Sequence, residues 1–550
     1  MIYYKLITSN RLKGEELRDK RLRNNNLIPR WRKKMSLTKE KVNQEVGKQQ
    51  LWASRFKKQT DPRSKQYTDS TIIDKPMFYH NIWGSEAHTI MLGKTGVITD
   101  SHTKEILTAL QKIKDDFANG DWDLRLQEED VQMNVERYVI DTVGIENGGR
   151  MHTCRSRNDQ VVVDTKLYAR EYLRKTMEKL IALIETFLTQ AKDHTHTLMP
   201  GYTHTQHAQP MTYAYWLTHY AAVFLRDLER LLQADSVNNT NPLGAGALTG
   251  TSFPIDRELT TKLLGFEKTQ DHCLDAVGAK DFNLQILSGL SILMSSVSRL
   301  ADEIIYGITQ EFNTMVLDDS FSMGSSMMPQ KKNPGVLELV RGRTGKMYGI
   351  LMAMLTTMKG LPSGYNRDYH EDKETLVEAL NLAHDSIDVM QGVMETLTIK
   401  EDRLKELASE NFATATELAN YLVREHDIPF RLCHRIVGYV VGELVQEGKN
   451  FNDKARTKEL LAEKEIQISD EDYEKTLNPE KVIQEYKSQG GTEATEVTRL
   501  ITNMTKELTE FKTDLESRNQ TVESAKAQTQ AAVSAILNGS SAEEAVAKGA

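Results

Sequence analysis

Two long stretches of this chain carry apolar residues at helical spacing, and they restrict the folds that it can adopt. In the first, apolar side chains recur at three- and four-residue steps, at Val163, Leu167, Leu173, Met177, Leu180, Ile184 and Phe187. The second keeps this spacing without a proline, at Leu287, Leu290, Met294, Val297, Leu300, Ile304 and Ile308. At 1.5 Å per residue each helix would span roughly 40 Å, more than a compact monomeric domain usually needs. The pattern predicts a bundle of long helices.

Further bundle helices are expected at residues 346–357 and 375–397, which places an all-α core at about 150–395. Apolar stripes of this length often bury their faces against copies of the same chain. We therefore expect a homo-oligomer. The fold class is all-α, with a long central helical bundle and smaller N- and C-terminal helical domains.

Composition excludes several classes of function. The chain has 550 residues, a formal net charge of −8 and a pI near 6.0, whereas nucleic-acid binding needs a basic surface. No apolar run approaches the roughly 20 residues that span a bilayer, so no membrane partner is expected. The three cysteines, Cys154, Cys273 and Cys433, lie far apart and form no Cys-x-x-Cys pair. They are interpreted as free thiols of a cytoplasmic protein.

Composition also changes along the chain and suggests five segments. Residues 1–34 hold eleven Lys and Arg against three acidic residues. They are either a targeting presequence, or an arm that is disordered or not translated because translation begins at Met35; RNA binding by this arm is a third possibility. An N-terminal domain at 35–150, a central long-helix domain at 151–395 and a C-terminal helical domain at 396–500 follow. Residues 501–550 form a polar helix and an Ala/Gln/Ser-rich tail, for which we expect disorder or a frayed helix from about 515.

The segment Gly324-Ser-Ser-Met-Met-Pro-Gln-Lys-Lys-Asn-Pro334 is the most informative string. Small residues at one end allow a loop to open and close, while two cations and an amide at the other end can grip an anion. The alternative is an ordinary Gly/Ser loop with a solvated lysine pair.

Two further strings begin and follow the first long helix. His152-Thr-Cys-Arg-Ser-Arg-Asn-Asp-Gln160 places hydroxyl, guanidinium and amide groups at a helix N-terminus, which suits a carboxylate ligand; the alternative is an N-cap with surface arginines. Pro200-Gly-Tyr-Thr-His-Thr-Gln-His-Ala-Gln-Pro210 has two histidines three residues apart. No third ligand stands at a suggestive spacing, so we expect no metal and favour acid–base work by one histidine.

A fourth string, Tyr365-Asn-Arg-Asp-Tyr-His-Glu-Asp-Lys373, has mixed charges that would suit any solvated helix face. None of the four strings contains a Gly-x-Ser-x-Gly hydrolase motif or a phosphate-binding Walker loop. Acyl transfer and nucleotide hydrolysis therefore receive no support, and no cofactor is expected.

Taken together, the strings resemble the fumarase/aspartase superfamily, whose signature is a Gly-Ser-Ser-x-x-Met-Pro-x-Lys-x-Asn-Pro type loop. Here that loop reads GSSMMPQKKNP, with one residue between the second Ser and the Met. HTCRSRNDQ, PGYTHTQHAQP and YNRDYHEDKE resemble the argininosuccinate lyase family in particular. LWASRF near 51, PLGAGALTGTSFPID near 242, FATATELANYLV near 412 and GGT at 490–492 extend the resemblance over roughly residues 50–500.

The resemblance implies a β-elimination that splits argininosuccinate, a small-molecule substrate, into arginine and fumarate. A proton beside a carboxylate is very weakly acidic, so the doubly charged aci-carboxylate intermediate must be stabilised by fixed cations and amides. By resemblance Ser325 is the base, Lys331 and Asn333 stabilise the intermediate, and His204 assists protonation of the departing nitrogen. A serine base needs help, for which closure of its loop beside Lys331 is a source.

The same resemblance implies a substrate site. Ser156, Arg157, Asn158 and Thr203 would bind the succinate part, with Tyr365, His370 and Lys373 nearby. Ser70 and Asp74 would meet the arginine part. In the family these groups come from different subunits, so a homotetramer would be required and monomers would be inactive.

Three residues depart from the family pattern. Cys154 stands in place of the usual Gly, where a positive φ would be strained, and Gln132 stands in place of His. His370 replaces a Gln, and a charged His could change the amine partner. A related lyase acting on another N-substituted aspartate, such as a diamine-succinate adduct, is therefore an alternative, and a non-catalytic crystallin-like protein is another.

Overall fold

The computed structural model describes residues 60–549, which fall into two compact units. The first unit holds 60–72 and 124–134, and the second holds 73–123 and 135–549. The basic extension at 1–34 and the LWASRF string lie outside the described residues. Elements of the first unit or at its borders are α3 (Pro62–Thr68), α4 (Thr71–Asp74), η3 (Leu126–Glu128) and α7 (Val131–Val143).

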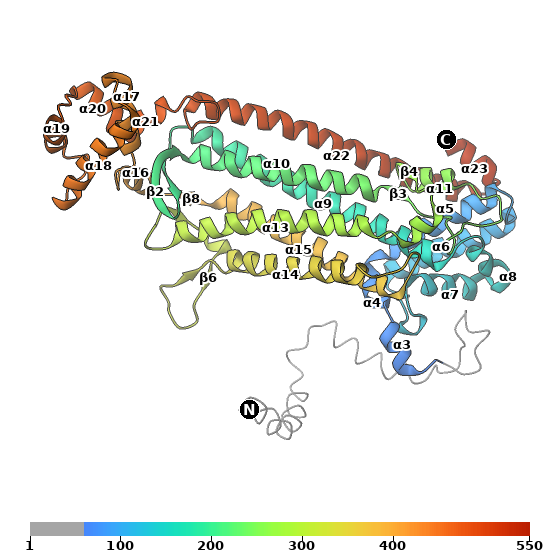
Figure 1. The fold of residues 1–550 in the computed structure, drawn as a ribbon. Coiled ribbons are helices and arrows are strands. Elements are labelled where there is room, and N and C mark those ends of the chain that lie inside the picture. Colours follow the sequence, from blue (N-terminus) through green and yellow to red (C-terminus); the bar gives the residue numbers. More distant parts are fainter. Residues whose placement is uncertain (1–59, 550) are drawn as a thin grey trace. The chain divides into compact units, whose positions relative to one another are not determined.

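The second unit is built on long helices that run alongside one another (Figure 1). They are α9 (Arg157–Asp193), α10 (Tyr213–Asn238), α13 (Asp281–Ile308), α14 (Gly335–Met358), α15 (Glu371–Thr396) and α22 (Ala494–Leu537). This confirms the predicted all-α fold. With 37 residues, α9 is about 55 Å long, longer than the sequence analysis estimated.

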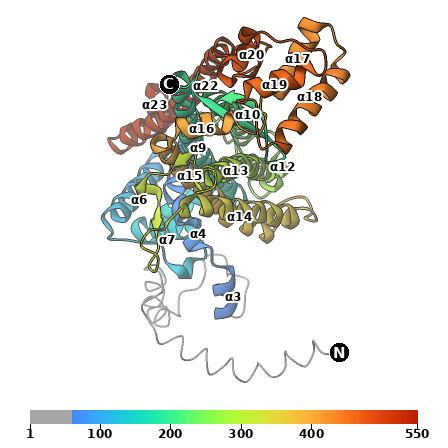
Figure 2. The ribbon, with the colours of Figure 1, turned by 90° about the vertical axis from the view of Figure 1, so that its left-hand side faces the viewer.

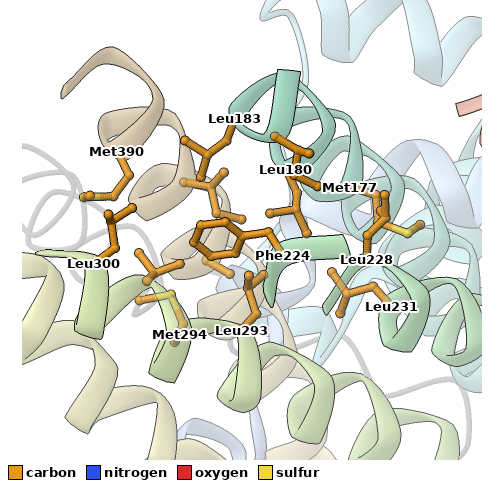
Figure 3. Packing of buried hydrophobic residues seen from close by; sticks show 14 of the residues in the cluster. Met177, Leu180, Leu183, Phe224, Leu228, Leu231, Leu293, Met294, Leu300 and Met390 are labelled. Atoms are coloured by element: carbon orange, nitrogen blue, oxygen red, sulfur yellow. The ribbon is translucent and has the colours of Figure 1, made fainter. Parts of the chain in front are cut away.

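The predicted apolar stripes form the core of this bundle. Every residue of the first stripe is buried, as is the second stripe up to Ile304. In Figure 3 the ring of Phe224 from α10 lies among Leu180 and Leu183 of α9 and Leu293 of α13. Burial of such side chains contributes about 1.5–3 kcal/mol each, so the helices are held by their inner faces.

One described helix, α13, is long and apolar enough to cross a membrane. However, 61% of its apolar window is buried inside the protein, and its stripe belongs to the bundle core. The apolar character of α13 is thus that of a core helix.

Shorter helices surround the two ends of the bundle (Figures 1 and 2). Those before and between the long helices are η2 (Lys75–Met77), α5 (Phe78–Lys94), α6 (Asp100–Asn119), α8 (Ile145–Gly148), η4 (Gly149–His152), α11 (Arg257–Leu263), α12 (Cys273–Gly278), η5 (Asp319–Phe321) and η6 (Arg367–His370). A later group comprises α16 (Glu401–Ala408), α17 (Ala415–His426), α18 (Phe430–Gln446), α19 (Lys454–Ala462), α20 (Asp470–Leu477), α21 (Pro479–Val482) and η7 (Ile483–Glu485). Within it, α17 to α20 share an apolar cluster of their own.

Within residues 60–549 the strands form only two-stranded sheets. β1 (Leu198–Thr203) pairs with β2 (Gln206–Thr212), β5 (Met315–Val316) with β8 (Thr398–Ile399), and β6 (Met323–Gly324) with β7 (Lys332–Asn333), all antiparallel; β3 (Thr240–Asn241) and β4 (Lys268–Thr269) are parallel. The β1–β2 and β6–β7 hairpins carry two of the predicted site strings on their loops.

The prediction for the tail was wrong. Residues 515–537 are neither disordered nor frayed but continue α22 without interruption, and α23 (Ala542–Gly549) follows. The buried residues of this part include the small Ala525, Thr529 and Ala532 beside Leu515, Val533 and Ile536. Small side chains allow close helix packing, but they give a weaker apolar pattern than the long stripes of α9 and α13.

Candidate active site

Ser156 caps the start of α9 and fixes the first predicted substrate segment. Its Oγ accepts a hydrogen bond from the Asn158 backbone N–H at 3.2 Å, and Asp159 Oδ1 accepts from the Ser156 N–H at 2.9 Å. This reciprocal capping box follows from the Ser-x-x-Asp spacing and satisfies helix N–H groups that lack partners within the helix. The positive end of the helix dipole therefore lies beside Ser156, Arg157 and Asn158.

Asp159 was not among the predicted site residues, although the capping spacing was visible in the sequence. Its other oxygen accepts from the backbone N–H groups of Gly244 and Gly246 at 3.0 and 2.9 Å. The side-chain amide of Asn158 donates to the Ala247 carbonyl at 3.0 Å. Burial raises the pKa of the Asp159 carboxyl to about 6, although these N–H donors oppose the shift. Asp159 thus holds the loop after β3 against the start of α9.

Two buried ion pairs anchor the start of α15. Lys373 Nζ lies 2.5 Å from Asp74 Oδ1, and Lys280 Nζ lies 2.6 Å from Asp372 Oδ2. All four side chains are at most 1% exposed. A buried charge is tolerated when it is paired, so these contacts fix α15 against α4 and the start of α13.

His370 lies where these elements meet. Burial lowers the pKa of its imidazole to about 3, and the positive charges of Lys373, Arg367, Arg157 and Lys280 lower it further in that order. At neutral pH the ring is therefore uncharged. Like the amide of Gln, a neutral imidazole offers one donor and one acceptor, which removes the concern that a charge at this position changes the amine partner.

Tyr365 stands in the turn that leads into this segment. Its ring centroid is 5.9 Å from that of Tyr369, whose hydroxyl donates to the Gly278 carbonyl at 2.8 Å. A Cβ on Gly278 would lie 2.9 Å from the Gly364 nitrogen, so the two backbones touch. We call Asp74, Ser156, Arg157, Asn158, Tyr365, His370 and Lys373 the α9-start cluster.

Thr203 and His204 lie at the tip of the β1–β2 hairpin. Thr203 pairs with Gln206, so His204 and Thr205 are the two central turn residues, with φ of 53° and 60°. Two positive φ values favour Gly or Asn, and a β-branched Thr is strained there. His204 is exposed, whereas His207 contacts the Tyr202 hydroxyl at 3.2 Å and the Asn411 amide at 3.0 Å. The two histidines thus have different surroundings.

Ser325, Lys331 and Asn333 lie on the β6–β7 hairpin. Gly324 pairs with Lys332, so residues 325–331 form its loop. Ser325 Oγ accepts from the backbone N–H groups of Met327 and Met328 at 3.3 and 3.0 Å. Lys331 is exposed, and Met327 is 87% exposed. The loop is shaped by its own backbone rather than by the bundle.

One chain does not bring the two hairpins to the α9-start cluster. β1 begins shortly after the end of α9, so about 55 Å of helix separates Thr203 and His204 from Ser156. Lys280 stands at the start of α13, and the Ser325 hairpin follows its far end, about 42 Å away. Figure 1 shows β2 and β6 at the end of the bundle opposite α5.

The remaining residues singled out from the sequence are Ser70, Gln132 and Cys154. Ser70 belongs to the first unit, where it is buried and its N–H donates to the Glu129 carbonyl at 2.8 Å. Gln132 is also buried. Cys154 has the positive φ, 67°, that would suit Gly, and burial raises the pKa of its thiol. All three cysteines are free, and no group of three metal-ligating side chains occurs in the described part of the chain.

The chain is similar to known proteins over most of its length. Residues 54–349 match the family described as "Lyase", and 412–484 match "Argininosuccinate lyase C-terminal". Argininosuccinate lyase of Lactococcus lactis subsp. lactis is 40% identical over 461 residues, which cover 84% of this chain and 99% of the relative. That of Desulfitobacterium hafniense (strain DSM 10664 / DCB-2) is 44% identical over 403 residues, covering 73% and 87%.

Solved structures share the fold. EDDS lyase in complex with formate superposes with a TM-score of 0.77 at 28% identity, covering 87% of this chain and 96% of that one. Class II fumarase from Schistosoma mansoni gives 0.64 at 16% identity, over 76% and 91%. The long-helix bundle is common to both. The sequence relatives of this chain and its two family matches place it in the argininosuccinate lyase family of the fumarase/aspartase superfamily.

Proposed function

We propose that this protein is a carbon–nitrogen lyase that splits argininosuccinate into arginine and fumarate in the cytoplasm. Sequence relatives with this activity in their names are 40–44% identical over most of the chain. The observation that carries the proposal is that a cation-rich cluster at a helix N-terminus occurs together with a separate hairpin that carries Ser325, Lys331 and Asn333. The first suits a dicarboxylate, and the second suits proton abstraction beside a carboxylate.

The proposed reaction is a β-elimination. Ser325 removes a proton from the carbon next to a carboxylate of the succinate part, and the electron pair is held as an aci-carboxylate. Lys331 and Asn333 stabilise the two negative charges. The pair then forms the C=C bond of fumarate while the neighbouring C–N bond breaks, and a proton delivered through His204 completes the arginine nitrogen.

Substrate binding is assigned to the rest of the predicted set. Ser156, Arg157 and Asn158 would bind a carboxylate of the succinate part at the start of α9, together with Thr203. Ser70 and Asp74 would meet the arginine part, together with His370, and Tyr365 and Lys373 would lie near the succinate part. A neutral His370 suits this role because it can donate to a carboxylate or accept from a guanidinium.

We also propose a homotetramer in which each site takes residues from several copies. Within one chain the hairpins and the α9-start cluster are separated by the length of α9, so a complete site requires another copy to supply the missing hairpins. Exposed apolar residues on the central helices support such an assembly. They include Ile292 of α13 and Leu339, Tyr348, Met352 and Leu355 of α14.

A second candidate is elimination from a different N-substituted aspartate. The similarity to EDDS lyase, a protein of the same fold at 28% identity, favours keeping it. The two candidates share the fumarate half and differ in the amine, so only the contacts around His370 and Ser70 would distinguish them.

The test is fumarate release, followed by ultraviolet absorbance, from argininosuccinate and from diamine-succinate adducts. Rapid release from argininosuccinate that Ser325→Ala abolishes would support the proposal. Release only from an adduct would transfer the assignment to the second candidate. No release from any of these substrates by a folded tetramer would refute both and favour a non-catalytic role.

A further inference from the structure

We propose that the end of the chain is part of the substrate-binding machinery: residues 518–549, the C-terminal strap, position Thr153–Asn158 through helix α5. The strap lies beyond the matched C-terminal family region, which ends at residue 484, and beyond the resemblance seen in the sequence. The inference rests on the proposed function for its kinetic test only.

Helix α5 is the link because two of its faces contact different partners. Nearly the whole helix is buried. Trp83, Glu86 and Gly93 are spaced by three and seven residues and contact the strap. Ser85 and His88 are offset from them and contact the segment before α9. A movement of one face of a rigid helix moves the other.

The strap is anchored at its beginning in the bundle. Arg518 donates to Asp235 Oδ2 at 3.0 Å and to Ser236 Oγ at 2.9 Å, and its carbonyl accepts from Arg174 at 2.8 Å. Asp235 is fully buried and also accepts two hydrogen bonds from Arg174. The strap therefore leaves α9 and α10 from a fixed point.

Its middle grips α5 through two polar residues. Trp83 Nε1 donates to Thr529 Oγ1 at 3.3 Å, and Thr529 itself donates to the Leu263 carbonyl at 2.7 Å. Gln530 Nε2 donates to Glu86 Oε2 at 2.6 Å, while Lys114 Nζ lies 3.1 Å from Glu86 Oε1. Glu86 is 1% exposed, so its oxygens need hydrogen-bond donors from the protein, and Gln111 Nε2 supplies a further one at 2.6 Å.

Its end closes on α5 by direct backbone approach. A Cβ on Gly93 would lie 2.9 Å from the Ala542 Cβ, and the Ala542 N–H donates to Asp100 Oδ1 at 3.0 Å. Gly265 makes a similar approach to Ala525, at 3.0 Å. Neither glycine has room for a side chain, so the strap packs directly against their backbones at a fixed distance.

The opposite face of α5 holds the segment that leads into the site. Ser85 Oγ accepts from Arg155 Nη1 at 3.1 Å, and the His88 ring lies 2.9 Å from the Thr153 carbonyl. Arg155 is only 6% exposed, and its Nε and Nη2 atoms have no hydrogen-bond partner among the described residues. The bond to Ser85 is therefore its one side-chain hydrogen bond there. Arg155 precedes Ser156 directly, so a shift of α5 displaces the cap of α9.

The decisive comparison uses two glutamines of α22. Gln530→Ala removes the contacts with Glu86 and with Lys114 Nζ, which donates to Gln530 Oε1 at 3.2 Å. Gln520→Ala is a matched control, because the Gln520 amide bonds to Ser524 of its own helix, at 3.3 Å. In the full-length tetramer we expect Gln530→Ala to raise KM for argininosuccinate by about threefold to tenfold, with little change in kcat. Hydrogen exchange of the Thr153–Asn158 amides should accelerate by a similar factor. Gln520→Ala should change neither.

A double-mutant cycle separates positioning from simple destabilisation. If the strap acts through Ser85, the KM effects of Gln530→Ala and Ser85→Ala will be less than additive. The inference is overturned if Gln530→Ala lowers only Tm, with KM and exchange at 153–158 equal to those of Gln520→Ala. A wild-type enzyme without activity on argininosuccinate would refute the proposed function, and the exchange comparison would still decide the role of the strap.

Discussion

The α9-start cluster and the two hairpins are built in opposite ways. Around Lys373 and Lys280 the charges are paired at 2.5–2.6 Å and removed from solvent, and His370 is kept neutral by its surroundings. On the hairpins His204 and Lys331 are exposed, and Ser325 is held by backbone N–H groups of its own loop. The charged groups of the cluster find their partners within the same chain, whereas the hairpins carry side chains that face solvent.

This difference shows how work is divided in the proposed enzyme. A dicarboxylate must be recognised by groups that are already in place, since preorganised dipoles and charges need not be reoriented when it binds. A base on a loop, in contrast, gains strength only when the loop closes and excludes water. A binding cluster buried in one copy, met by an exposed hairpin from another, would satisfy both requirements.

The largest expected effect is on activity, when one inactivating substitution is placed in each of the two regions. Ser325→Ala and Arg157→Ala should each lower kcat/KM by about 10²–10⁴-fold, because each removes one half of the proposed site. If the halves come from different copies, denaturing and refolding the variants together should restore about a quarter of wild-type activity, because random mixing joins two intact halves at one site in four. Fumarate release measures the recovery.

Each variant refolded with itself serves as the control for that mixture. A mixture no more active than its parents, although tetramers containing both variants form, would mean that a single copy supplies both halves. The contrast between the two regions would then be one of exposure without a division between copies.

The next effect concerns stability and compares a buried with an exposed ion pair. Lys280→Met leaves the Asp372 carboxylate buried without its partner, which should cost about 3–5 kcal/mol. Lys332→Met removes an ion pair with Asp319 on the Ser325 hairpin, where both side chains are more than 60% exposed, and should cost at most about 1 kcal/mol. Thermal unfolding of the two variants gives the comparison. Equal losses of Tm would contradict the contrast.

The sequence predicted the fold because helical spacing is local information. The residues between Val163 and Phe187 repeat at a helical period, and the period alone tells which face is buried. The prediction for the tail was wrong because it, too, relied on local apolar spacing. The packing of the tail against Gly93 and Gly265 depends on the absence of side chains, and small residues give no apolar period to detect.

The site was only partly predictable. Resemblance supplied the residues, but the neutrality of His370 depends first on burial, and then on charges from η6, α15 and the starts of α9 and α13. Likewise, the distance between the hairpins and the cluster follows from the length and direction of α9, which the strings themselves do not encode. Long-range geometry therefore had to come from the structure.

A smaller effect, on pH dependence, tests whether the cluster keeps His370 neutral. Its folded pKa of about 3 lies below the ordinary value of 6.5, so between these limits the unfolded chain binds more protons. The free energy of unfolding should therefore fall as the pH drops below about 6.5. His370→Gln removes this pH-dependent contribution to the free energy of unfolding. We expect the Tm of the variant to fall by about 2–4 °C less than that of the wild type between pH 7 and 5.

The exposed His434 provides the control, since His434→Gln is the same substitution at a solvated side chain outside the cluster. The KM of His370→Gln for argininosuccinate should stay within about threefold of wild type, because an amide offers the same donor and acceptor as a neutral imidazole. A wild-type profile parallel to that of His370→Gln would show that the ring takes up its proton in the folded protein as readily as in the unfolded chain.

The smallest effect concerns strain in the backbone that leads into the cluster. Cys154 holds a φ of 67°, which costs an L-residue about 1–2 kcal/mol relative to glycine. Cys154→Gly should recover part of this and lose the contact between the thiol and Thr251, for a net gain of about 1 kcal/mol in thermal unfolding. The buried Cys433 has an ordinary helical backbone, so Cys433→Gly should destabilise instead. If Cys154→Gly lowers Tm, the thiol contact outweighs the strain, and the cluster is held at this point by the side chain of Cys154 rather than in spite of it.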